Sequence, residues 1–459
     1  MPKTRTVYIC SSCASESSHW FGQCASCSEW NTCTEDVVVT AKSSKISGGF
    51  GGRSLSSGGR SLGSGGVKPV RLSKLSSKPP KRISSKIPEF DRVLGGGFVP
   101  GQVILLGGAP GIGKSTLLTE IAKTLKGTNV LYVCGEESAD QIKLRTSRMK
   151  YDAENLLMLP ETNVESIVGT VESYSGGGSG PDADKLGLII VDSIQTLYSE
   201  DFSGIAGSVS QVKGCSQMLT NAAKSVGIPM VLVGHVTKQG TVAGPKILEH
   251  IVDTVLYLEG DTQHLFRLLR TEKNRFGPVS EIGVFEMVEN GLNGVNNPSE
   301  MFLAEMAENS SGSVVTVVME GHRPILFEVQ ALTVRTSFGY PRRTTSGFNS
   351  NRLQVLIATL EKRAGLNLGN HDVYVSVAGG FKVSEYSADL AVCMAIASSL
   401  EDKPLKPKTA VFGECGLGGE IRKVPHAEKR VSEAKKLGYS NIVSPKNAKN
   451  LRRAISLSL

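Results

Sequence analysis

The segment Gly-Ala-Pro-Gly-Ile-Gly-Lys-Ser at positions 108–115 has the composition and spacing of a phosphate-binding loop. Its glycines allow backbone N–H groups to turn inward onto phosphate oxygens, which the Lys114 ammonium also reaches. An apolar run at 103–106 precedes the loop and an apolar-periodic stretch at 117–125 follows it, as a strand and a helix should. The sequence therefore predicts ATP binding with Mg²⁺. The predicted nucleotide contacts are Gly108, Ala109, Pro110, Gly111, Ile112, Gly113, Lys114, Ser115 and Thr116.

Carboxylates follow two further apolar runs. Asp192 ends the run at 188–191, where a second strand would place its carboxylate beside the magnesium ion that Ser115 also coordinates. A simple strand-end cap is the alternative interpretation of Asp192. Glu136 and Glu137 follow the run at 130–133, and one of them could polarise the attacking water. We favour Glu136, and an exposed charged turn is the alternative for Glu137.

Two Cys-x2-Cys pairs near the N-terminus predict a metal site. Four thiolates can surround one Zn²⁺ tetrahedrally, which leaves no open position for catalysis, so the site would be structural. We interpret Cys33 and His19 as bystanders, and expect Trp20 and Trp30 to shield the site or to contact a partner. A zinc-folded docking unit without nucleic-acid contacts stays an open alternative. The predicted ligands are Cys10, Cys13, Cys24 and Cys27.

Composition limits the class of protein. The chain has 459 residues, of which 40% are hydrophobic and 20% charged, enough to bury two or three domain cores. Its longest apolar stretches are too short to span a membrane. Five of the nine cysteines lie in the first 33 residues, which argues against a disulfide framework and suits a reducing compartment. The net charge is +8, and eleven Lys and Arg with no acidic residue lie between Asp36 and Glu89.

These features divide the chain into four parts. Residues 1–36 form the zinc finger, and residues 37–83 form a Ser-, Gly- and Lys-rich flexible linker whose cations could also hold nucleic-acid phosphates. In residues 84–297 short apolar runs alternate with helix-like stretches, which is typical of a parallel sheet with crossover helices. The expected strands are 103–106, 130–133, 188–191, 230–233 and 255–258, with an exposed loop at 175–180.

Residues 298–459 form a second, mixed α/β domain. The expected strands are 314–319, 326–334 and 373–377, and the expected helices are 387–400 and 429–437. Ser387 precedes an apolar helix and suits its N-cap, with Asp389 near the positive end of the helix.

Together these motifs resemble the RadA (Sms) family of DNA repair proteins over nearly the whole chain. The resemblance is carried by the phosphate-binding loop, by Ile-Pro-Glu-Phe-Asp-Arg-Val-Leu-Gly-Gly-Gly at 87–97, by Gly-Glu-Glu-Ser at 135–138, and most specifically by the pentad Lys-Asn-Arg-Phe-Gly at 273–277. It implies an α/β fold: a RecA-like P-loop NTPase core with an N-terminal zinc finger and a C-terminal Lon-protease-like α/β domain. It also implies a homohexameric, DnaB-like, DNA-dependent ATPase and helicase that promotes branch migration in homologous recombination.

The resemblance assigns further residues. Lys273 and Arg275 of the pentad would lie at a subunit boundary and touch the neighbour's nucleotide, where a cation stabilises transition-state charge. His235 would sense the γ-phosphate. The loop at 237–245 resembles a mobile DNA-contacting loop, with Lys238 and Lys246 as candidate phosphate contacts. The chain departs from the family pattern at Ala14, where glycine is usual, and at Cys33, where an aliphatic residue is usual.

Two other classes of function stay open. The C-terminal resemblance to Lon proteases suggests an ATP-dependent serine peptidase with Ser387 as nucleophile and Lys423 as base, although the Gly-Pro-Ser-Ala-Gly setting is absent. A KaiC-like, ATP-switched scaffold would hydrolyse ATP slowly and without stimulation by DNA. The zinc finger and the pentad favour the motor over both.

The expected partners are single-stranded and branched DNA, a RecA-type recombinase and further copies of the chain, but no membrane. The sequence begins without a signal peptide, and little room for a transit peptide precedes Cys10. We expect a cytoplasmic location if the protein is bacterial. The alternative is a mitochondrial or chloroplast protein whose presequence is missing from this chain.

Overall fold

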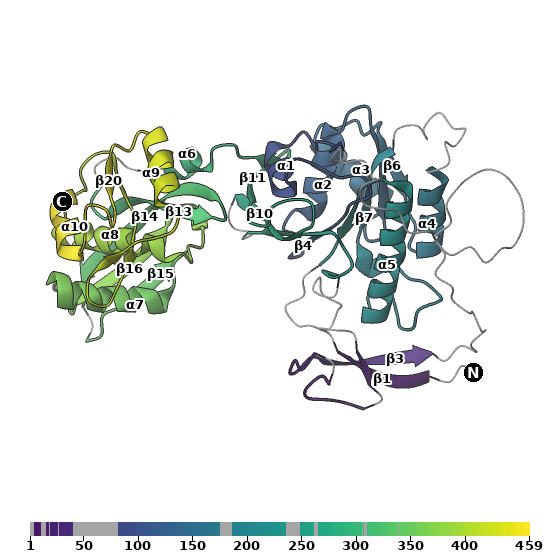
Figure 1. The fold of residues 1–459 in the computed structure, drawn as a ribbon, viewed down its shortest axis with the longest axis horizontal. Coiled ribbons are helices and arrows are strands. Elements are labelled where there is room, and N and C mark those ends of the chain that lie inside the picture. The colour runs from purple at the N-terminus through teal and green to yellow at the C-terminus, as the bar shows by residue number, and fades with distance from the viewer. Residues whose placement is uncertain are drawn as a thin grey trace, which may run out of the picture.

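The computed structural model describes most of the chain and gives three folded parts (Figure 1). The described residues are 4–10, 15–17, 19–25, 27–39, 81–174, 186–235, 248–260, 265–304, 306, 310–337 and 339–459. Some of the predicted features lie outside the described residues. These are the metal ligand Cys13, the exposed loop at 175–180, the loop at 237–245 with its Lys238, the neighbouring Lys246, and most of the linker.

The N-terminal part is a three-stranded antiparallel sheet in the order β2-β1-β3. Its strands are β1 (Thr4–Cys10), β2 (Glu16–Ser17) and β3 (Cys33–Val39). β1 pairs with β3 along its whole length, from Thr4 opposite Val39 to Cys10 opposite Cys33. Regular pairing therefore continues past residue 36. At the other end of the expected linker, Ile83 already pairs with Phe98 of the next domain.

A nine-stranded sheet in the order β12-β11-β10-β9-β4-β8-β7-β5-β6 organises the central domain. The strands from β9 to β6 run parallel to one another, whereas β10, β11 and β12 are antiparallel additions at one edge. The strands are β4 (Val103–Gly108), β5 (Asn129–Cys134), β6 (Leu156–Leu159), β7 (Leu186–Asp192), β8 (Met230–Val233), β9 (Thr254–Glu259), β10 (Phe266–Asn274), β11 (Ile282–Val288) and β12 (Gly291–Gly294). The RecA-like P-loop fold and all five expected strands are confirmed.

Local sequence signals explain where the helices begin. α3 begins after Ser138, whose hydroxyl and Gln141 form a reciprocal capping box, and α4 begins after Asn163, whose side chain accepts from the Ser166 N–H. α1 starts at Pro88 because proline needs no N–H partner there. The helices are α1 (Pro88–Leu94), α2 (Lys114–Thr124), α3 (Ala139–Arg148), α4 (Val164–Ser173), the short η4 (Ile194–Thr196) and α5 (Val209–Val226).

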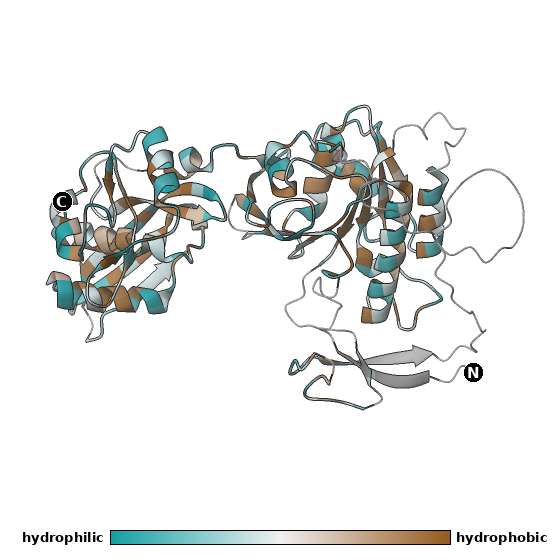
Figure 2. Ribbon diagram, viewed as in Figure 1, coloured by the Kyte–Doolittle hydropathy of each residue, from teal (hydrophilic) through white to brown (hydrophobic). Residues whose placement is uncertain are grey.

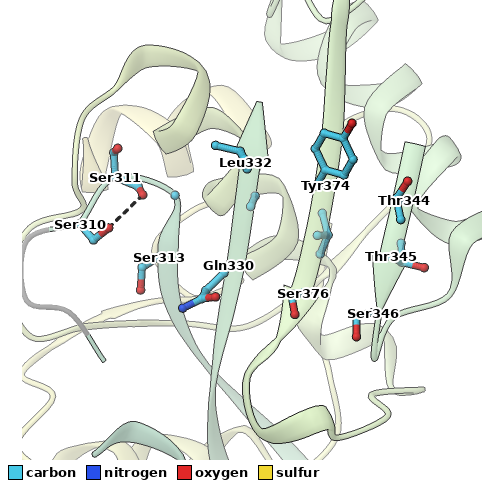
Figure 3. Close-up of a pocket in the computed structure, with 13 residues that line it drawn as sticks. Ser310, Ser311, Ser313, Gln330, Leu332, Thr344, Thr345, Ser346, Tyr374 and Ser376 are labelled. Atoms are coloured by element: carbon cyan, nitrogen blue, oxygen red, sulfur yellow. Dashed lines mark hydrogen bonds between the residues drawn. The ribbon is translucent and has the colours of Figure 1, made fainter. Parts of the chain in front are cut away.

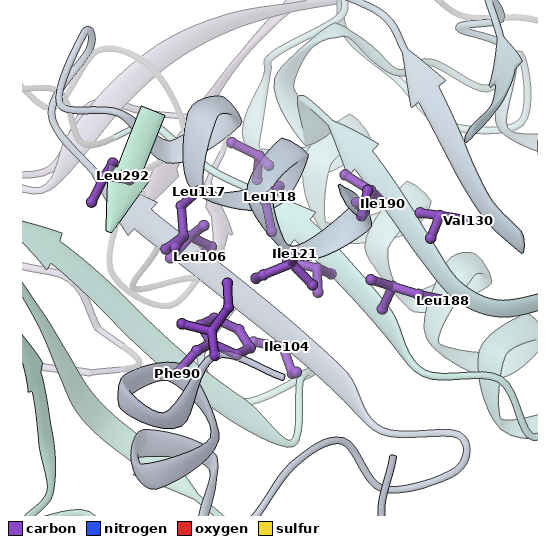
Figure 4. Packing of buried hydrophobic residues seen from close by; sticks show 14 of the residues in the cluster. Phe90, Ile104, Leu106, Leu117, Leu118, Ile121, Val130, Leu188, Ile190 and Leu292 are labelled. Atoms are coloured by element: carbon purple, nitrogen blue, oxygen red, sulfur yellow. The ribbon is translucent and has the colours of Figure 1, made fainter. Parts of the chain in front are cut away.

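Each face of the central sheet is covered by helices, which explains why its parallel strands are apolar throughout. Figure 4 shows α2 packed across the strands, with Leu117 and Ile121 directed at Ile104 and Leu106 of β4. The alternate residues of β4 point to the opposite core, which α4 and α5 close. Figure 2 shows the same division, with apolar residues on the strands and polar residues on the outer helix faces. This double burial fixes the loop that joins β4 to α2.

The C-terminal domain is built on a six-stranded sheet in the order β15-β16-β14-β13-β17-β20. Its strands are β13 (Ser313–Glu320), β14 (Arg323–Arg335), β15 (Arg343–Ser346), β16 (His371–Val377), β17 (Thr409–Val411) and β20 (Asn441–Val443), and β18 (Glu414–Cys415) pairs separately with β19 (Ile421–Arg422). Its helices are α6 (Pro298–Leu303), α7 (Ser350–Thr359), the π-helix η6 (Leu360–Ala364), η7 (Ala378–Gly380), η8 (Tyr386–Ala388), α8 (Asp389–Glu401), α9 (Ala427–Lys436) and α10 (Leu451–Ser458). The expected mixed α/β domain is confirmed.

Among the described residues, no helix has both the length and the apolar character needed to cross a bilayer.

Candidate functional site

The phosphate-binding loop emerges from the carboxyl end of β4, between β9 and β8. Gly108 and Gly113 have φ values of +155° and +110°, which L side chains rarely adopt. A Cβ atom at Gly108 would lie 2.6 Å from the Leu258 carbonyl oxygen, so the loop can follow this path only with glycine there. At Gly111 a Cβ atom would meet nothing within 4 Å. The loop is therefore closely packed against β9 at Gly108 and open at Gly111, where phosphates would bind.

Lys114 opens α2 and is only 4% exposed. Its Nζ donates to the carbonyl oxygens of Gly108 and Ala109, each at 2.9 Å, and to His235 Nδ1 at 3.1 Å. Burial lowers the pKa of Lys114, while the charges of Asp192 and Glu136 raise it. The ammonium is thus held by its own loop, at the position from which it can transfer to phosphate oxygens.

His235 joins Lys114 to Glu136. Its Nε2 lies 2.9 Å from Glu136 Oε2. Because the Lys114 ammonium can only donate, His235 Nδ1 must accept, and the ring proton then sits on Nε2 and is donated to the carboxylate. His235 therefore connects the phosphate-binding lysine to the candidate base in a chain of two hydrogen bonds.

Asp192 lies at the end of β7 beside these groups and is 5% exposed. One of its oxygens, Oδ2, accepts from the Tyr132 hydroxyl at 2.6 Å. Burial and the neighbouring Asp192 charge raise the pKa of Tyr132 well above its ordinary value, so the phenol stays a hydrogen-bond donor. Ligand atoms of Asp192, Glu136 and His235 lie within 4.8 Å of one another. The carboxylate oxygens suit Mg²⁺, which prefers oxygen ligands together with substrate phosphates.

The two neighbouring glutamates point to different partners. Glu137 forms an ion pair with Arg145 of α3. Glu136 is about half exposed and faces His235 across the site. This division supports Glu136 as the carboxylate that serves the nucleotide, and gives Glu137 a structural contact instead of the free, exposed turn considered above.

Sequence reasoning missed several residues of the site. Arg267 on β10 is buried and donates from Nε to the Ile112 carbonyl at 3.1 Å, which ties the loop to the antiparallel edge of the sheet. Ser193 Oγ and Gln195 Oε1 are buried without a hydrogen-bond partner in the described part of the chain. Gln195 lies three residues after Asp192, a proximity that could have drawn attention to it. Neither Tyr132 nor Arg267 carries any comparable local signal.

Lys273 and Arg275 are not near the loop of their own chain. Lys273 Nζ donates to the backbone carbonyls of Glu249 and Val252, the latter at 2.9 Å. Arg275 pairs with the buried Asp253 at 3.2 Å. Burial lowers the pKa of Lys273, and the nearby Arg275 charge lowers it further.

The strand register shows how far apart these parts are. Asn274 of the pentad is level with Thr254 on β9, and Thr254 is level with Ile104 on β4. The loop begins at Gly108, four residues further along β4, which corresponds to roughly 13 Å at the rise of a parallel strand. The pentad therefore lies near the amino end of the parallel strands, whereas the loop lies at their carboxyl end. At this separation the cations of the pentad cannot serve the nucleotide site of the same subunit.

The N-terminal cysteines gather as the spacing predicts. The sulfur atoms of Cys10, Cys24 and Cys27 lie within 4.8 Å of one another, and Cys10 and Cys27 are 3.6 Å apart. Three thiolates at such separations fit a tetrahedral Zn²⁺ site. Cys33 lies opposite Cys10 on β3 but outside this cluster, which supports its interpretation as a bystander.

The two tryptophans are largely exposed. Trp20 is 68% exposed and Trp30 is 66% exposed, so most of each side chain faces solvent, and the expectation that they shield the metal site stays a prediction. Each ring lies within 4 Å of the position that a Cβ atom would take at Gly22. They are exposed on one side of the finger, and contact with a partner stays a prediction.

The C-terminal serine lies in a closed network. Ser387 is 1% exposed; its hydroxyl donates to Glu385 at 2.8 Å and accepts from Arg430 at 3.1 Å. Lys423, the supposed base, is exposed and is not a partner of Ser387. The expected N-cap role of Ser387 is wrong as well, because α8 begins at Asp389 and its N-cap residue is Ala388. Ser387 instead helps to bury the Arg430 guanidinium.

A separate cavity of about 480 Å³ opens on the C-terminal sheet (Figure 3). It is lined by a row of side chains that crosses four strands: Ser313, Gln330, Ser376 and Ser346. Its lining contains hydroxyl and amide groups but no charged residue. Because it contains neither Ser387 nor an acid or base, it does not support a peptidase site.

Comparison with known proteins finds a separate family match for each of the three folded parts. Residues 8–35 match the rubredoxin metal binding domain, residues 69–241 the AAA domain, and residues 344–448 the ChlI subunit of Mg-chelatase. The zinc-ribbon, P-loop and ChlI- or Lon-like parts are each similar to a described domain.

Full-length relatives are also found. The DNA repair protein RadA of Bacillus subtilis (strain 168) is 45% identical over 447 residues, covering 97% of this chain and 93% of the relative. RadA of Streptococcus pyogenes serotype M6 is 47% identical over 451 residues, covering 98% and 94%. Among solved structures, a KaiC-like protein from Pyrococcus horikoshii OT3 matches at 22% identity with a TM-score of 0.38, covering 47% of this chain and 100% of that protein.

Proposed function

The chain belongs to the RadA family of DNA repair proteins, and from that premise we propose that it is a DNA-dependent ATPase of homologous recombination and repair. Its motor activity would be that of a DnaB-like helicase that promotes branch migration. The observation that carries the ATPase proposal is the chain of contacts from Lys114 through His235 to Glu136, beside Asp192 and the open phosphate-binding loop.

The residues of the site divide the chemistry among them. Backbone N–H groups of the loop and Lys114 bind the phosphates, while Ser115 and Asp192 would hold the Mg²⁺ that neutralises phosphate charge. Glu136 accepts a proton from the attacking water as the bond between the γ-phosphorus and the β–γ bridging oxygen breaks, which yields ADP and phosphate. His235 contacts both Lys114 and Glu136, so it is placed to report whether a γ-phosphate is present.

The pentad supports assembly into a ring. Its cations lie near the amino end of the parallel strands, away from the loop at their carboxyl end. If they contact nucleotide at all, that nucleotide must be bound by a neighbouring subunit. We propose that Lys273 and Arg275 complete the neighbour's site in a homohexamer, where Arg275 stabilises transition-state charge.

The remaining parts are assigned to binding. The zinc finger would hold one Zn²⁺ and contact DNA or a RecA-type recombinase, and the C-terminal domain would be a ring-forming platform beside single-stranded and branched DNA. A serine peptidase is disfavoured by the buried contacts of Ser387. A KaiC-like switch differs from the motor in one measurable property: DNA would not stimulate its ATP hydrolysis.

ATP hydrolysis with and without single-stranded DNA tests the proposal, with wild type and Lys114→Ala in parallel. A several-fold stimulation by DNA that is lost in the variant is the expected result. Equal, slow hydrolysis in both conditions would overturn the motor and favour the switched scaffold. Hydrolysis that survives Lys114→Ala would exclude the assigned site.

A further inference from the structure

The turn that joins β13 to β14 (residues 320–323, the hairpin turn) leaves the C-terminal domain and contacts the central domain on both sides of the pentad. Before the pentad, Arg270 on β10 donates to Glu320 Oε2 at 2.7 Å. After the pentad, the His322 N–H donates to the Ser280 carbonyl at 2.9 Å. The pentad is therefore bracketed by two contacts with one short segment of the other domain.

The contact at Ser280 is close enough to require glycine in the turn. Gly321 has a φ of +60°, and a Cβ atom added there would overlap the Ser280 carbonyl. The His322 ring adds a second hydrogen bond, between its Nδ1 and the Ser280 hydroxyl. Backbone and side chain of the hairpin turn thus hold the same residue, three positions beyond the pentad.

A third contact passes through α1. Arg323 pairs with the fully buried Glu89 at 2.6 Å. At the other end of the same helix, the Leu94 carbonyl accepts from the Asn274 side chain of the pentad at 3.3 Å. Without Arg323 the buried Glu89 carboxylate would keep only Arg92 and the Val284 N–H as partners, and such a loss is costly for a buried charge. We therefore expect α1 and the hairpin turn to move together.

The hairpin turn is also anchored within its own domain. The buried Arg430 of α9 donates to the Val317 carbonyl of β13 at 2.6 Å and pairs with Glu385. Glu385 in turn accepts from the Met319 N–H at 2.8 Å. The end of β13 is therefore fixed to the core of the C-terminal domain, and a displacement of that domain would be passed to the pentad.

We propose that the hairpin turn positions Arg275, so that the C-terminal domain of one subunit sets the rate of ATP hydrolysis in its neighbour. This inference rests on the proposed role of Arg275 in trans. The C-terminal domain then has a regulatory part in the ATPase cycle in addition to forming the ring. The residues of the hairpin turn are positioning residues, because they act through Arg275 and not on the nucleotide.

Gly321→Ala is the variant that separates the turn from Ser280. Its matched control is Gly438→Ala in the same domain, where φ is +86° and an added Cβ atom would meet nothing within 4 Å. Both changes impose backbone strain of the same kind, but only the first affects the contact. We expect kcat of Gly321→Ala to fall by about ten- to a hundredfold relative to the control, the loss that misplacement of a catalytic group by about 1 Å can cause. KM for ATP should stay unchanged, since the loop that binds ATP is untouched.

Mixed assemblies identify the step that is lost. Subunits with Gly321→Ala keep an intact phosphate-binding loop, whereas Lys114→Ala subunits keep an intact pentad. Mixing them should restore activity, because about a quarter of randomly formed head-to-tail interfaces combine the two intact halves. Mixing Gly321→Ala with Arg275→Ala should restore none, since both lack a correctly placed Arg275.

Other outcomes decide against the inference or against its premise. The positioning role is wrong if Gly321→Ala hydrolyses ATP within twofold of the Gly438→Ala control. It is also wrong if mixing with Lys114→Ala restores no activity, or if mixing with Arg275→Ala does restore it. If Arg275→Ala and Lys114→Ala fail to complement each other, the action in trans is wrong, which is a failure of the proposed function. Should Gly321→Ala fail to assemble by light scattering, His322→Ala replaces it, and an unchanged kcat there would overturn the proposal.

Discussion

At the scale of single residues, the nucleotide site is defined by which charged groups face each other. Glu136 and Glu137 are adjacent in sequence, yet one contacts His235 and the other Arg145. The contact with His235 brings Glu136 within reach of the γ-phosphate position that Lys114 marks. A proton acceptor at that position and a carboxylate held by an arginine have different chemical uses, although their side chains are identical.

This difference gives a paired prediction. Glu136→Gln should lower kcat for ATP hydrolysis by about 10²- to 10⁴-fold, the usual contribution of a general base, and should leave ATP binding intact. Glu137→Gln, the matched control, should keep kcat within a few-fold of wild type. Steady-state hydrolysis and equilibrium binding of a fluorescent ATP analogue measure the two effects. Equal losses in both variants would contradict the assignment of the base.

At the scale of secondary-structure elements, the N-terminal sheet is too small to be stable through its apolar core alone. Three short strands carry the finger, and two large aromatic side chains of this part are exposed instead of packed. A small unit of this kind needs a bound metal to fold. The clustered sulfur atoms of Cys10, Cys24 and Cys27 supply the ligands for it.

Zinc content tests this element. Cys24→Ser should reduce bound zinc from about one ion per chain to nearly none, because a structural site needs all four of its ligands. Cys33→Ser should retain the metal, since Cys33 lies outside the sulfur cluster. Elemental analysis of the purified full chain gives the stoichiometry. Retention of zinc by Cys24→Ser, or its loss from Cys33→Ser, would require a different ligand set.

At the scale of the whole molecule, the two parts of the proposed shared site lie at opposite ends of the parallel strands of one subunit. The loop is at the carboxyl end of the parallel strands, and the pentad is near their amino end, beside the C-terminal domain. A head-to-tail interface brings such parts together and closes into a ring when the rotation between subunits allows it. This geometry predicts that assembly and hydrolysis depend on each other.

The assembly has a defined expected mass. With ATP and Mg²⁺, light scattering should give about six times the 48.8 kDa chain mass, in keeping with a closed cyclic oligomer. Arg275→Ala should assemble similarly while losing most of its hydrolysis, because the arginine acts on the transition state and not on the fold. A monomer that hydrolyses ATP at the wild-type rate would exclude the shared site.

The sequence by itself determined the parts whose chemistry depends on short spacings. The phosphate-binding loop, the Cys-x2-Cys pairs and the apolar strands are each specified within about twenty residues, so local patterns predict them. The parallel sheet of the central domain and the mixed C-terminal domain followed from the same patterns, and the RecA-like topology followed from the resemblance to the RadA family. The edge strands β10 to β12 did not, because β10 alternates between buried and half-buried residues and β11 and β12 are buried over only part of their length, which are weaker signals than the apolar runs of the parallel strands.

Only the tertiary structure decided which distant groups meet. Tyr132 reaches Asp192 because β5 pairs with β7, and Arg267 reaches the loop from an antiparallel strand about 150 residues later in the chain. The hairpin turn contacts the pentad's flanks for the same reason: the fold brings its end against Ser280. Such contacts depend on strand order and on domain packing, which no local spacing encodes, and the same strand order separates the phosphate-binding loop from the pentad within one chain.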